Sequence, residues 1–474
     1  MRHLTLLVAT AALAACASGP QVADVRPAAT TFIAAAWQAP APQGGDAQDL
    51  AQWWSRVDDP VLPALIDAAQ SISATLSAAS SRIAAARAAR VAAGTDVAVQ
   101  GSASALRGRP DLASPSSNSI GLSAQAQWDL DPFGARRAAR QAADARYEGA
   151  QDRWHEARIN LNAKVATEYL ALRACEAQLE QRQTDAASRA ETARLIGLTA
   201  QAGLASPADA ALARASAAQT RSQVVQQSTR CQASIKALVA LTALEEAALR
   251  DRLSPFRARL PQFAPIDLPA LPASLLKQRP DLAEAERTLV AAAADEQQAR
   301  AQRWPQVSIS GTLGASRLTT SNVRLEGSTW SLGPVQISLP IFDGGTREAR
   351  VGAARAAYDD AVVQYQARVR QAVREVEEAL LALDSARQRE VDAQVAADGF
   401  EQALRATEAR HRGGLASLLE LEDTRRTAIA ARAALIDLRQ DRLGAWISLY
   451  RALGGDWSPS QTVSTAPAGS RQER

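Results

Sequence analysis

The four-residue stretch GLAS occurs twice in this chain of 474 residues, at residues 203–206 and again at residues 414–417. The two copies start 211 residues apart, which is nearly half of the chain. Tyr147 and Tyr358 keep the same offset. Motifs that recur in the same order at a fixed offset indicate a tandem structural repeat.

Long helical segments flank each GLAS stretch. The segment from residue 135 to about residue 200 contains no proline, and apolar residues recur in it every seven positions, as at Val165, Leu172 and Leu179. A corresponding segment begins near Thr346. A helix of ~60 residues would be ~90 Å long, far longer than a helix of a globular domain, and needs a coiled-coil partner. Because another helical segment follows each GLAS stretch, each half is predicted to contain a long helical hairpin.

Each GLAS stretch has the chemistry of a tight turn between two helices. Gly203 and Gly414 supply the left-handed conformation in which helices commonly end. Ser206 is followed by proline, and Ser417 is followed three positions later by Glu420, as at a helix N-terminus. The glycines and serines are therefore explained by turn geometry alone, whatever else they do.

Between the helices the apolar period changes to two. Alternation is clear in SIGLSAQAQWDLD (residues 119–131) and weaker over residues 97–107. In the second half it is found in QVSISGTLG (306–314) and TWSLGPVQISLPIF (329–342). Its phase slips by one at Gly333–Pro334, as a β-bulge would cause. These segments predict four strands, two in each half, each with one apolar and one polar face.

Each half is thus predicted to have the order helix, β-hairpin, long helix, turn and long helix. The opening helix should extend to about Val91 in the first half and over about residues 274–303 in the second. The chain is divided into a signal peptide (1–15), an N-terminal tether (16–52), a first repeat (53–253), a proline-rich linker (254–273), a second repeat (274–457) and a flexible tail (458–474).

The N-terminus reads MRHLTLLVATAALAAC. Arg2 followed by the apolar run from Leu4 to Leu13 is typical of a secretory signal, and the run is too short to span a membrane. Its end, LAAC, resembles a bacterial lipobox, which implies cleavage before Cys16 and lipidation of that thiol. After Cys16 no apolar run reaches the ~20 residues of a transmembrane helix, so any membrane-spanning part must consist of strands.

Composition and motifs exclude several classes of protein. The chain has 53 basic and 50 acidic residues, a balance that argues against nucleic-acid binding. Its histidines are His3, His155 and His411, and no metal-ligand spacing, phosphate-binding loop or nucleophile elbow occurs. We therefore predict no catalytic residues, no metal site, no cofactor and no enzymatic activity.

Four strands in one chain cannot close a membrane barrel, for which the usual minimum is ~8 strands. Unpaired strand edges are not tolerated in lipid. Three copies of the chain would supply twelve strands, and their long helices would form a tube. The strand count therefore predicts an oligomer, and a homotrimer is one way to close the barrel.

Several motifs carry a family resemblance over nearly the whole chain after Cys16. They are the lipobox, the two GLAS turns, WWSRVDDPVLPALIDAA (53–69), WDLDPFGARR (128–137), LLKQRPDLAEAE (275–286) and ISLPIFDGG (337–345). In their order and spacing the chain resembles the TolC-type outer membrane efflux factors, in particular the NodT-like lipoprotein branch. It departs from the family at SISATL (71–76), where an asparagine-containing turn is usual, and we expect a change of local capping there.

The resemblance implies a mainly α-helical chain with membrane strands, assembled as a trimeric twelve-stranded outer-membrane β-barrel that continues into a periplasmic α-helical barrel. It further implies a lipid-anchored Gram-negative outer membrane protein that works with a periplasmic adaptor (membrane fusion) protein and an inner-membrane pump. The expected function is export of drugs or other small solutes. Two alternatives remain, a duct for type I protein secretion and a periplasmic coiled-coil scaffold without a pore. The alternating strands argue against the scaffold.

The resemblance also implies roles at the hairpin turns. Glu420 and Asp423 correspond to acidic residues that line the closed periplasmic aperture, although capping alone could explain Glu420. Asp423 has no such explanation. The small surfaces of the turns are expected to contact the adaptor through Gly203, Leu204, Ser206, Gly414, Leu415 and Ser417.

Two cysteines lie symmetrically about the first turn. Cys175 is 28 residues before Gly203, and Cys231 is 28 residues after it. Two uninterrupted antiparallel helices would bring them to the same height. A disulfide needs Cα atoms ~4.4–6.8 Å apart, so both side chains must face the seam between the helices. The alternatives are this disulfide and two buried, unpaired thiols.

Overall fold

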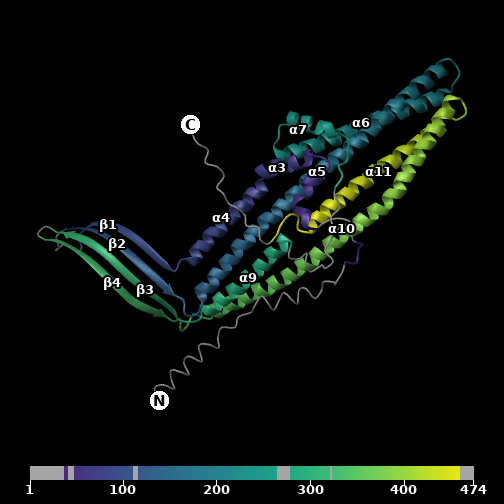
Figure 1. Cartoon of the computed structure of the whole chain (residues 1–474). Helices are drawn as coiled ribbons and strands as arrows, with labels where there is room; N and C mark the ends of the chain where they lie inside the picture. The colour runs from purple at the N-terminus through teal and green to yellow at the C-terminus, as the bar shows by residue number, and fades with distance from the viewer. Residues whose placement is uncertain (1–36, 41–46, 110–115, 264–277, 321–322, 459–474) are drawn as a thin grey trace. The chain divides into compact units, whose positions relative to one another are not determined.

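The computed structural model describes residues 37–40, 47–109, 116–263, 278–320 and 323–458. The signal peptide, Cys16, most of the tether and nearly all of the tail lie outside these residues. The elements in chain order (Figure 1) are η2 (Ala47–Arg56), α3 (Val61–Ile72), α4 (Ala74–Gly94), β1 (Val97–Gly108), β2 (Ser117–Leu130), α5 (Ala135–Gln201), α6 (Pro207–Thr242), α7 (Glu246–Leu253), η3 (Ser254–Phe256), α9 (Pro280–Ala301), β3 (Gln306–Thr319), β4 (Arg324–Ser338), α10 (Thr346–Arg412) and α11 (Leu418–Ala452).

Each predicted repeat contributes to both of two compact units. One unit contains the strands and the helical segments next to them, within Ser81–Gln151 and Ala283–Ala367. The other contains the rest of the long helices with their turns, within Asp152–Leu282 and Arg368–Arg474, together with the segment up to Ser80. The units therefore cut across the repeats, because helices α5 and α10 each pass from one unit into the other.

The long helices reproduce the predicted duplication. Helices α5 and α10 have 67 residues each, and their first residues are 211 positions apart, the same offset as the GLAS stretches. Helices α6 and α11 also begin 211 positions apart. At 1.5 Å per residue, α5 and α10 are each about 100 Å long. The predicted bounds near Ala135 and Thr346 are confirmed.

The opening helix of the first half is broken, whereas the sequence predicted one helix to about Val91. The break is at Ser73, whose backbone is extended with ψ of 119°. Its hydroxyl accepts the N–H of Leu76 at 3.3 Å, which starts helix α4. The serine lies in SISATL, the stretch that departs from the family pattern, and it caps α4 there. In the second half, α9 begins at Pro280, six residues later than predicted.

No single helix in the described ranges has both the length and the apolar composition needed to cross a membrane. Helices α3 and α4 meet that test only when taken together, as a pair bent by 47°.

The strands form one antiparallel sheet in the order β1-β2-β3-β4 (Figure 1). The sequence predicted two hairpins, one in each half. It did not predict the pairing of β2 with β3, which joins the halves along thirteen residue pairs from Asn118↔Thr319 to Leu130↔Val307. Strand β4 ends at Ser338, so Leu339 and Ile341 of the predicted strand lie beyond it.

The predicted bulge is present in β4. Ile309 pairs with Val335, and Gly311 pairs with Leu332, so β4 has one residue more than β3 over this step. Gly333 has a φ of 103°, in a region that side chains rarely adopt. The extra residue restores the apolar residues of β4 to one face on both sides of the bulge.

Aromatic side chains hold the segment before α3 against the C-terminal part of α11. The Trp53 ring stacks on Tyr450 with centroids 5.0 Å apart, and Trp54 meets Tyr450 edge-on at 4.9 Å. Nearby, the buried hydroxyl of Tyr169 donates to Asp59. These contacts join the segment of residues 53–59 to α11 through Tyr450 and to α5 through Tyr169.

Candidate functional site

Both GLAS turns end the preceding helix in the same way. Gly203 has a φ of 75° and Gly414 a φ of 74°, in the left-handed region. In each turn the N–H of the leucine after the glycine donates to the carbonyl five residues back, at 2.8 Å. This is the Schellman arrangement, which satisfies carbonyls that a helix end leaves unpaired. The turns lie at the same end of the two hairpins (Figure 1).

The turns present their leucines to solvent and use their serines as caps. Leu204 is 81% exposed and Leu415 is 75% exposed. The Ser206 hydroxyl accepts an N–H at 3.1 Å from the second residue of α6, and the Ser417 hydroxyl accepts the N–H of Glu420 at 3.1 Å. The predicted caps are therefore present, and two exposed apolar side chains stand on rigid, small-residue turns.

The two residues predicted to line the aperture are both exposed and paired within one chain. The Glu420 carboxylate accepts from Arg410 at 2.7 Å. Helix capping thus accounts for the bond between the Ser417 hydroxyl and the backbone N–H of Glu420, whereas the Glu420 carboxylate binds Arg410 instead. Asp423 lies 3.4 Å from Arg426, one turn along the same helix. Each acidic group therefore has a basic neighbour that lowers its repulsion from other carboxylates.

A cluster of buried charges lies between the four long helices, and the sequence reasoning missed it. We call it the four-helix ion cluster. Its centre is almost completely shielded from solvent, since Glu422 is 5% and Arg425 is 3% exposed, whereas the Glu408 side chain at its edge is 30% exposed. Its members are Asp185 and Arg189 of α5, Ser216 of α6, Glu408 of α10, and Glu422 and Arg425 of α11.

Glu422 is the centre of this cluster. One carboxylate oxygen accepts from Arg189 and from the hydroxyl of Ser216, the latter at 2.7 Å. The other accepts from Arg425 at 2.9 Å, and Arg425 also donates to Glu408 at 3.2 Å. One carboxylate therefore ties α11 to both helices of the first hairpin, while its arginine partner ties α11 to α10.

The cluster also contains a carboxyl group, that of Asp185, whose pKa is raised by burial. Asp185 accepts from Arg189 Nε at 2.9 Å. Burial raises the pKa of the Asp185 carboxyl from its ordinary value, although the attraction of Arg189 opposes the increase. The group therefore takes up a proton more readily in the folded protein than in the unfolded chain.

The sequence held a signal for this cluster. Leu418, Leu421, Glu422, Arg425 and Ala428 lie at the spacings of three and four residues that mark one face of a helix. All five are buried in α11. Charged residues at core-facing positions of a helical period predict a buried ion pair, but the partner on another helix cannot be read from the period.

The structure joins Cys175 of α5 to Cys231 of α6 in a disulfide, with Cα atoms 5.5 Å apart. Gln227 also packs on the bridge, donating to the carbonyl of Cys175 at 3.3 Å. Both cysteines are buried. Both cysteine side chains therefore face the seam between α5 and α6. Their equal distances from Gly203 in the sequence predicted that they lie at the same height but did not predict this orientation.

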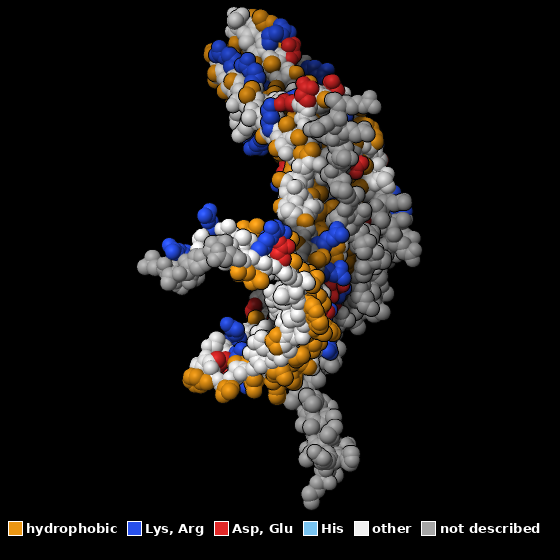
Figure 2. Space-filling model, turned by 90° about the vertical axis from the view of Figure 1, so that its left-hand side faces the viewer, with side chains coloured by type: hydrophobic (Ala, Val, Ile, Leu, Met, Phe, Trp, Pro, Cys, Tyr) orange, Lys and Arg blue, Asp and Glu red, His pale blue; other side chains and the backbone are white. Residues whose placement is uncertain are grey.

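The sheet has one apolar and one polar face, and both are exposed in a single chain. On the polar face, hydroxyls bond across strands, Ser102 with Ser123 at 2.8 Å and Thr312 with Ser331 at 2.7 Å. In Figure 2 hydrophobic side chains gather on one side of this part of the molecule. Those exposed on the apolar face include Val97, Val99, Ile120, Leu122, Trp128, Leu313, Trp330, Leu332, Val335 and Ile337. An apolar face of this size indicates a surface covered by lipid or by another chain.

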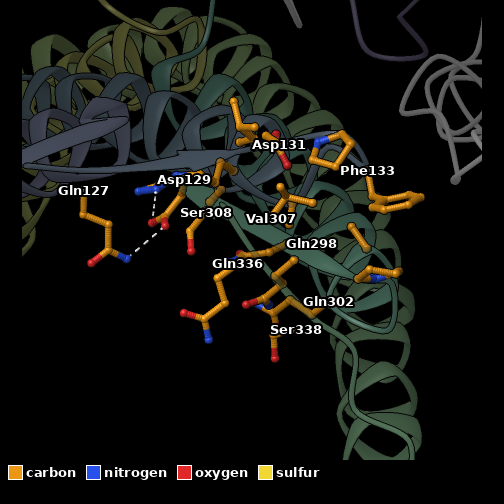
Figure 3. Close-up of a pocket in the computed structure, with 18 of the residues that line it drawn as sticks. Gln127, Asp129, Asp131, Phe133, Gln298, Gln302, Val307, Ser308, Gln336 and Ser338 are labelled. Atoms are coloured by element: carbon orange, nitrogen blue, oxygen red, sulfur yellow. Dashed lines mark hydrogen bonds and ion pairs between the residues drawn. The ribbon is translucent and has the colours of Figure 1, made fainter. Parts of the chain in front are cut away.

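A hollow of about 550 Å³ lies where the strands meet the helices (Figure 3). Amide and hydroxyl side chains line it, among them Gln298, Gln302 and Gln336. Asp129 accepts from Gln127 at 3.1 Å and from Arg136 at 3.0 Å. The rest of the lining is largely apolar and includes Leu130, Phe133 and Val307, so the hollow combines hydrogen-bonding groups with apolar surface.

No three histidine, cysteine or acidic side chains converge to form a metal site within the ranges that the structure describes.

Comparisons with known proteins agree with this architecture. The family model described as "Outer membrane efflux protein" matches residues 65–244 and 271–455, one match in each predicted repeat. The chain is 31% identical over 474 residues to outer membrane protein OprJ of Pseudomonas aeruginosa, covering 97% of both proteins. It is 30% identical over 379 residues to the solvent efflux pump outer membrane protein SrpC of Pseudomonas putida, covering 77% of this chain and 78% of that protein.

Among solved structures, the outer-membrane channel OprN superposes with a TM-score of 0.78 and 27% identity, covering 93% of this chain and 99% of that one. The resemblance that the sequence motifs indicated is therefore confirmed, as is the prediction that the protein is not an enzyme. With a matched repeat in each half and full-length similarity to outer membrane channels, this chain belongs to the outer membrane efflux protein family.

Proposed function

We propose that three copies of this chain form an outer membrane duct that exports small solutes, in a tripartite system with a periplasmic adaptor and an inner-membrane pump. The observation that carries the proposal is the sheet, with its apolar face, its polar face and its two unpaired edges at β1 and β4. A membrane sheet must close on itself because lipid cannot satisfy the hydrogen-bonding groups of its edges.

Three copies satisfy this requirement better than two. Each chain contributes four strands, so two copies would give an eight-stranded barrel. A barrel of ~8 strands has an interior that side chains fill, whereas larger barrels leave an aqueous channel. The small residues on the polar face, with Ser102, Ser123, Thr312 and Ser331 among them, would then line an open lumen of twelve strands.

The helical hairpins would continue the duct and dock the adaptor. Leu204 and Leu415 are exposed apolar side chains on turns whose glycines keep the backbone accessible. Such a surface suits helical hairpins of a partner, which pack apolar side chains between small residues. Because the first turn and its duplicate are alike in geometry, each chain would offer two similar docking positions.

Efflux of small solutes is favoured over protein secretion by the relatives. SrpC is described as part of a solvent efflux pump, and the family model is one of efflux proteins. The mixed polar and apolar lining of the hollow beside Asp129 contains no feature specific to one solute. We therefore propose that the pump and adaptor select the cargo and that this chain supplies a permissive conduit.

We further propose that Glu420 and Asp423 line the narrowest part of the periplasmic entrance. Three copies would contribute six carboxylates there. Their neighbours Arg410 and Arg426 neutralise part of this charge, at 2.7 Å and 3.4 Å. A ring of acidic side chains favours cations over anions, so the closed entrance should be blocked by bound cations.

Lipidation of Cys16 is the proposed attachment to the inner leaflet of the outer membrane. Replacing Cys16 with serine should abolish incorporation of labelled palmitate. Insertion of the strands should persist, since the apolar face of the sheet provides its own hold on the bilayer. Equal labelling of both proteins would contradict the anchor assignment.

One experiment tests the assembly directly. The protein, extracted in detergent, should have a protein mass three times that of one processed chain and should form conducting channels in planar bilayers. The Cys16→Ser variant is the matched control, because it should keep both properties. A folded monomer that forms no channels would refute the duct.

A further inference from the structure

The apolar face of the sheet ends in a border of charged side chains near the hairpin loops. Arg317 of β3 pairs in register with Ile120 on one side and with Glu326 of β4 on the other. The next row runs across all four strands. Arg107 of β1 pairs with Asn118 of β2, and Thr319 of β3 pairs with both Asn118 and Arg324 of β4.

These charges lie on the same face as the exposed apolar residues. Side chains alternate between the two faces of a strand, and residues opposite each other in register share a face. Arg107 therefore shares a face with Val97, and Arg324 shares one with Trp330. We call Arg107, Arg317, Arg324 and Glu326 the basic border.

The basic border has more positive than negative charge. Arg324 Nε donates to one oxygen of Glu326 at 2.6 Å, and Arg317 Nε forms an ion pair with the same oxygen at 2.6 Å. The basic border thus contains three guanidinium groups and one carboxylate, which contacts Arg317 and Arg324. The side chains of Arg317 and Arg324 are 50% and 60% exposed, so they remain accessible beside Glu326. Glu326 holds the two guanidiniums side by side without cancelling their charge.

The apolar part of the face has the height of a membrane core. It extends from the row of Val307 to the row of Ala315, eight residues along β3. At ~3.4 Å per residue this is about 27 Å of strand, or about 20 Å of height at the usual strand tilt, close to the ~25 Å apolar band of outer membrane proteins. The basic border begins where this band ends.

The border lies at the end of the sheet that is distant from the helices. Helices α4 and α5 adjoin the row of Val97 and Trp128, at the other end of the strands. Since the protein extends from the outer membrane into the periplasm on its helical side, the border is at the level of the outer leaflet. We propose that Arg107, Arg317 and Arg324 bind the phosphate groups of outer-leaflet lipids, an inference that depends on the membrane-spanning sheet of the proposed function.

Arginine is suited to this role. Its planar guanidinium donates two parallel hydrogen bonds to a phosphate and remains charged at every physiological pH. In the closed trimer β4 of one copy and β1 of the next are neighbours, so Arg324 and Arg107 of adjacent copies would stand at one seam. The outer-leaflet phosphates would then bridge guanidiniums of two copies and stabilise the assembly.

The test measures the preference of the reconstituted full-length channel for anionic lipid. The channel is placed in phosphatidylcholine vesicles with a trace of spin-labelled phosphatidylglycerol or spin-labelled phosphatidylcholine, and the immobilised fraction of each probe is compared. We expect the anionic probe to be favoured about fivefold at low salt, the effect of one basic residue near a membrane surface, and less at high salt.

Two variants of the border should move this preference in opposite directions. The Arg107→Gln, Arg317→Gln, Arg324→Gln variant should bind the two probes equally, whereas Glu326→Gln should increase the preference for the anionic probe. The matched control replaces exposed arginines of the long helices, Arg194, Arg374 and Arg387, and should behave as the wild type.

Channel conductance in the same vesicles separates this inference from the proposed function. Wild-type channels that conduct but bind both probes equally would overturn the lipid site and leave the duct intact. Wild-type protein that never conducts would overturn the duct itself. Should the triple variant fail to insert, the salt dependence of the wild type and the increase in Glu326→Gln still decide the matter, and absence of both refutes the proposal.

Discussion

Replacing Glu422 with glutamine should loosen the contact between the two helical hairpins. In the four-helix ion cluster this carboxylate accepts from Arg189, Ser216 and Arg425 on three helices. Glutamine keeps the size and one acceptor oxygen of the side chain but removes the negative charge. Two guanidinium groups would then share a buried region with less compensating charge.

The burial of the cluster sets the magnitude. The side chains of Glu422 and Arg425 are 6% and 4% exposed, so solvent screens their attraction little. Breaking such a buried pair from one side costs about 3–5 kcal/mol, and the retained hydrogen bonds of glutamine favour the lower value of about 3 kcal/mol. Because ~1.4 kcal/mol is a factor of ten, local opening at the hairpins should become roughly a hundredfold more frequent.

Amide hydrogen exchange measures this opening, in peptides that contain the first turns of α6 and α11. The matched control is Glu420→Gln, two residues earlier on the same helix, where the carboxylate and its partner Arg410 are 42% and 51% exposed. Exposed pairs contribute about 0–1 kcal/mol, so exchange in the control should change less than about fivefold. Equal exchange in the two variants would show that Glu422 does not join the hairpins.

The other predictions concern the disulfide, the buried acid and the entrance. Serine at both Cys175 and Cys231, whose bridge spans 56 residues, should cost about 4 kcal/mol in the chain-entropy model and lower the melting temperature measured without reductant; an unchanged melting temperature would contradict this. Because burial raises the pKa of Asp185, acidification from neutral pH should stabilise wild type relative to Asp185→Asn, the folded state binding the proton first. Melting curves whose difference is independent of pH would refute that. Alanine at both Glu420 and Asp423 should raise single-channel conductance and weaken cation block; unchanged values would leave the entrance unassigned.

Local chemistry allowed the helices and turns to be predicted closely. The turns at Gly203 and Gly414 were identified because glycine, serine and the residues after them carry the full set of signals for ending one helix and starting another. The ends of α5 and α10 followed from their uninterrupted seven-residue period. The slip at Gly333–Pro334 was visible because a bulge shifts the phase of a period-two pattern.

Contacts between segments that are distant in the sequence could not be predicted from local chemistry. The pairing of β2 with β3 depends on how the two halves meet, and no turn sequence connects those strands. Arg189 and Glu422 lie in different hairpins, so their ion pair required the packing of the helices to be known. The break at Ser73 arises from one side-chain cap within a stretch whose composition favours helix throughout.

The bridge between Cys175 and Cys231 also determines what the third cysteine can do. The chain has three cysteines, and the bridge consumes two of them. A thiolate at Cys16 could attack that bridge and produce mispaired isomers, because disulfides exchange through attack by a free thiolate. Lipidation would convert Cys16 into a thioether, which cannot exchange. Lipidation of the Cys16 thiol would thus do more than attach the chain to a membrane, because it would remove the third thiol and so protect the bridge between Cys175 and Cys231 from exchange.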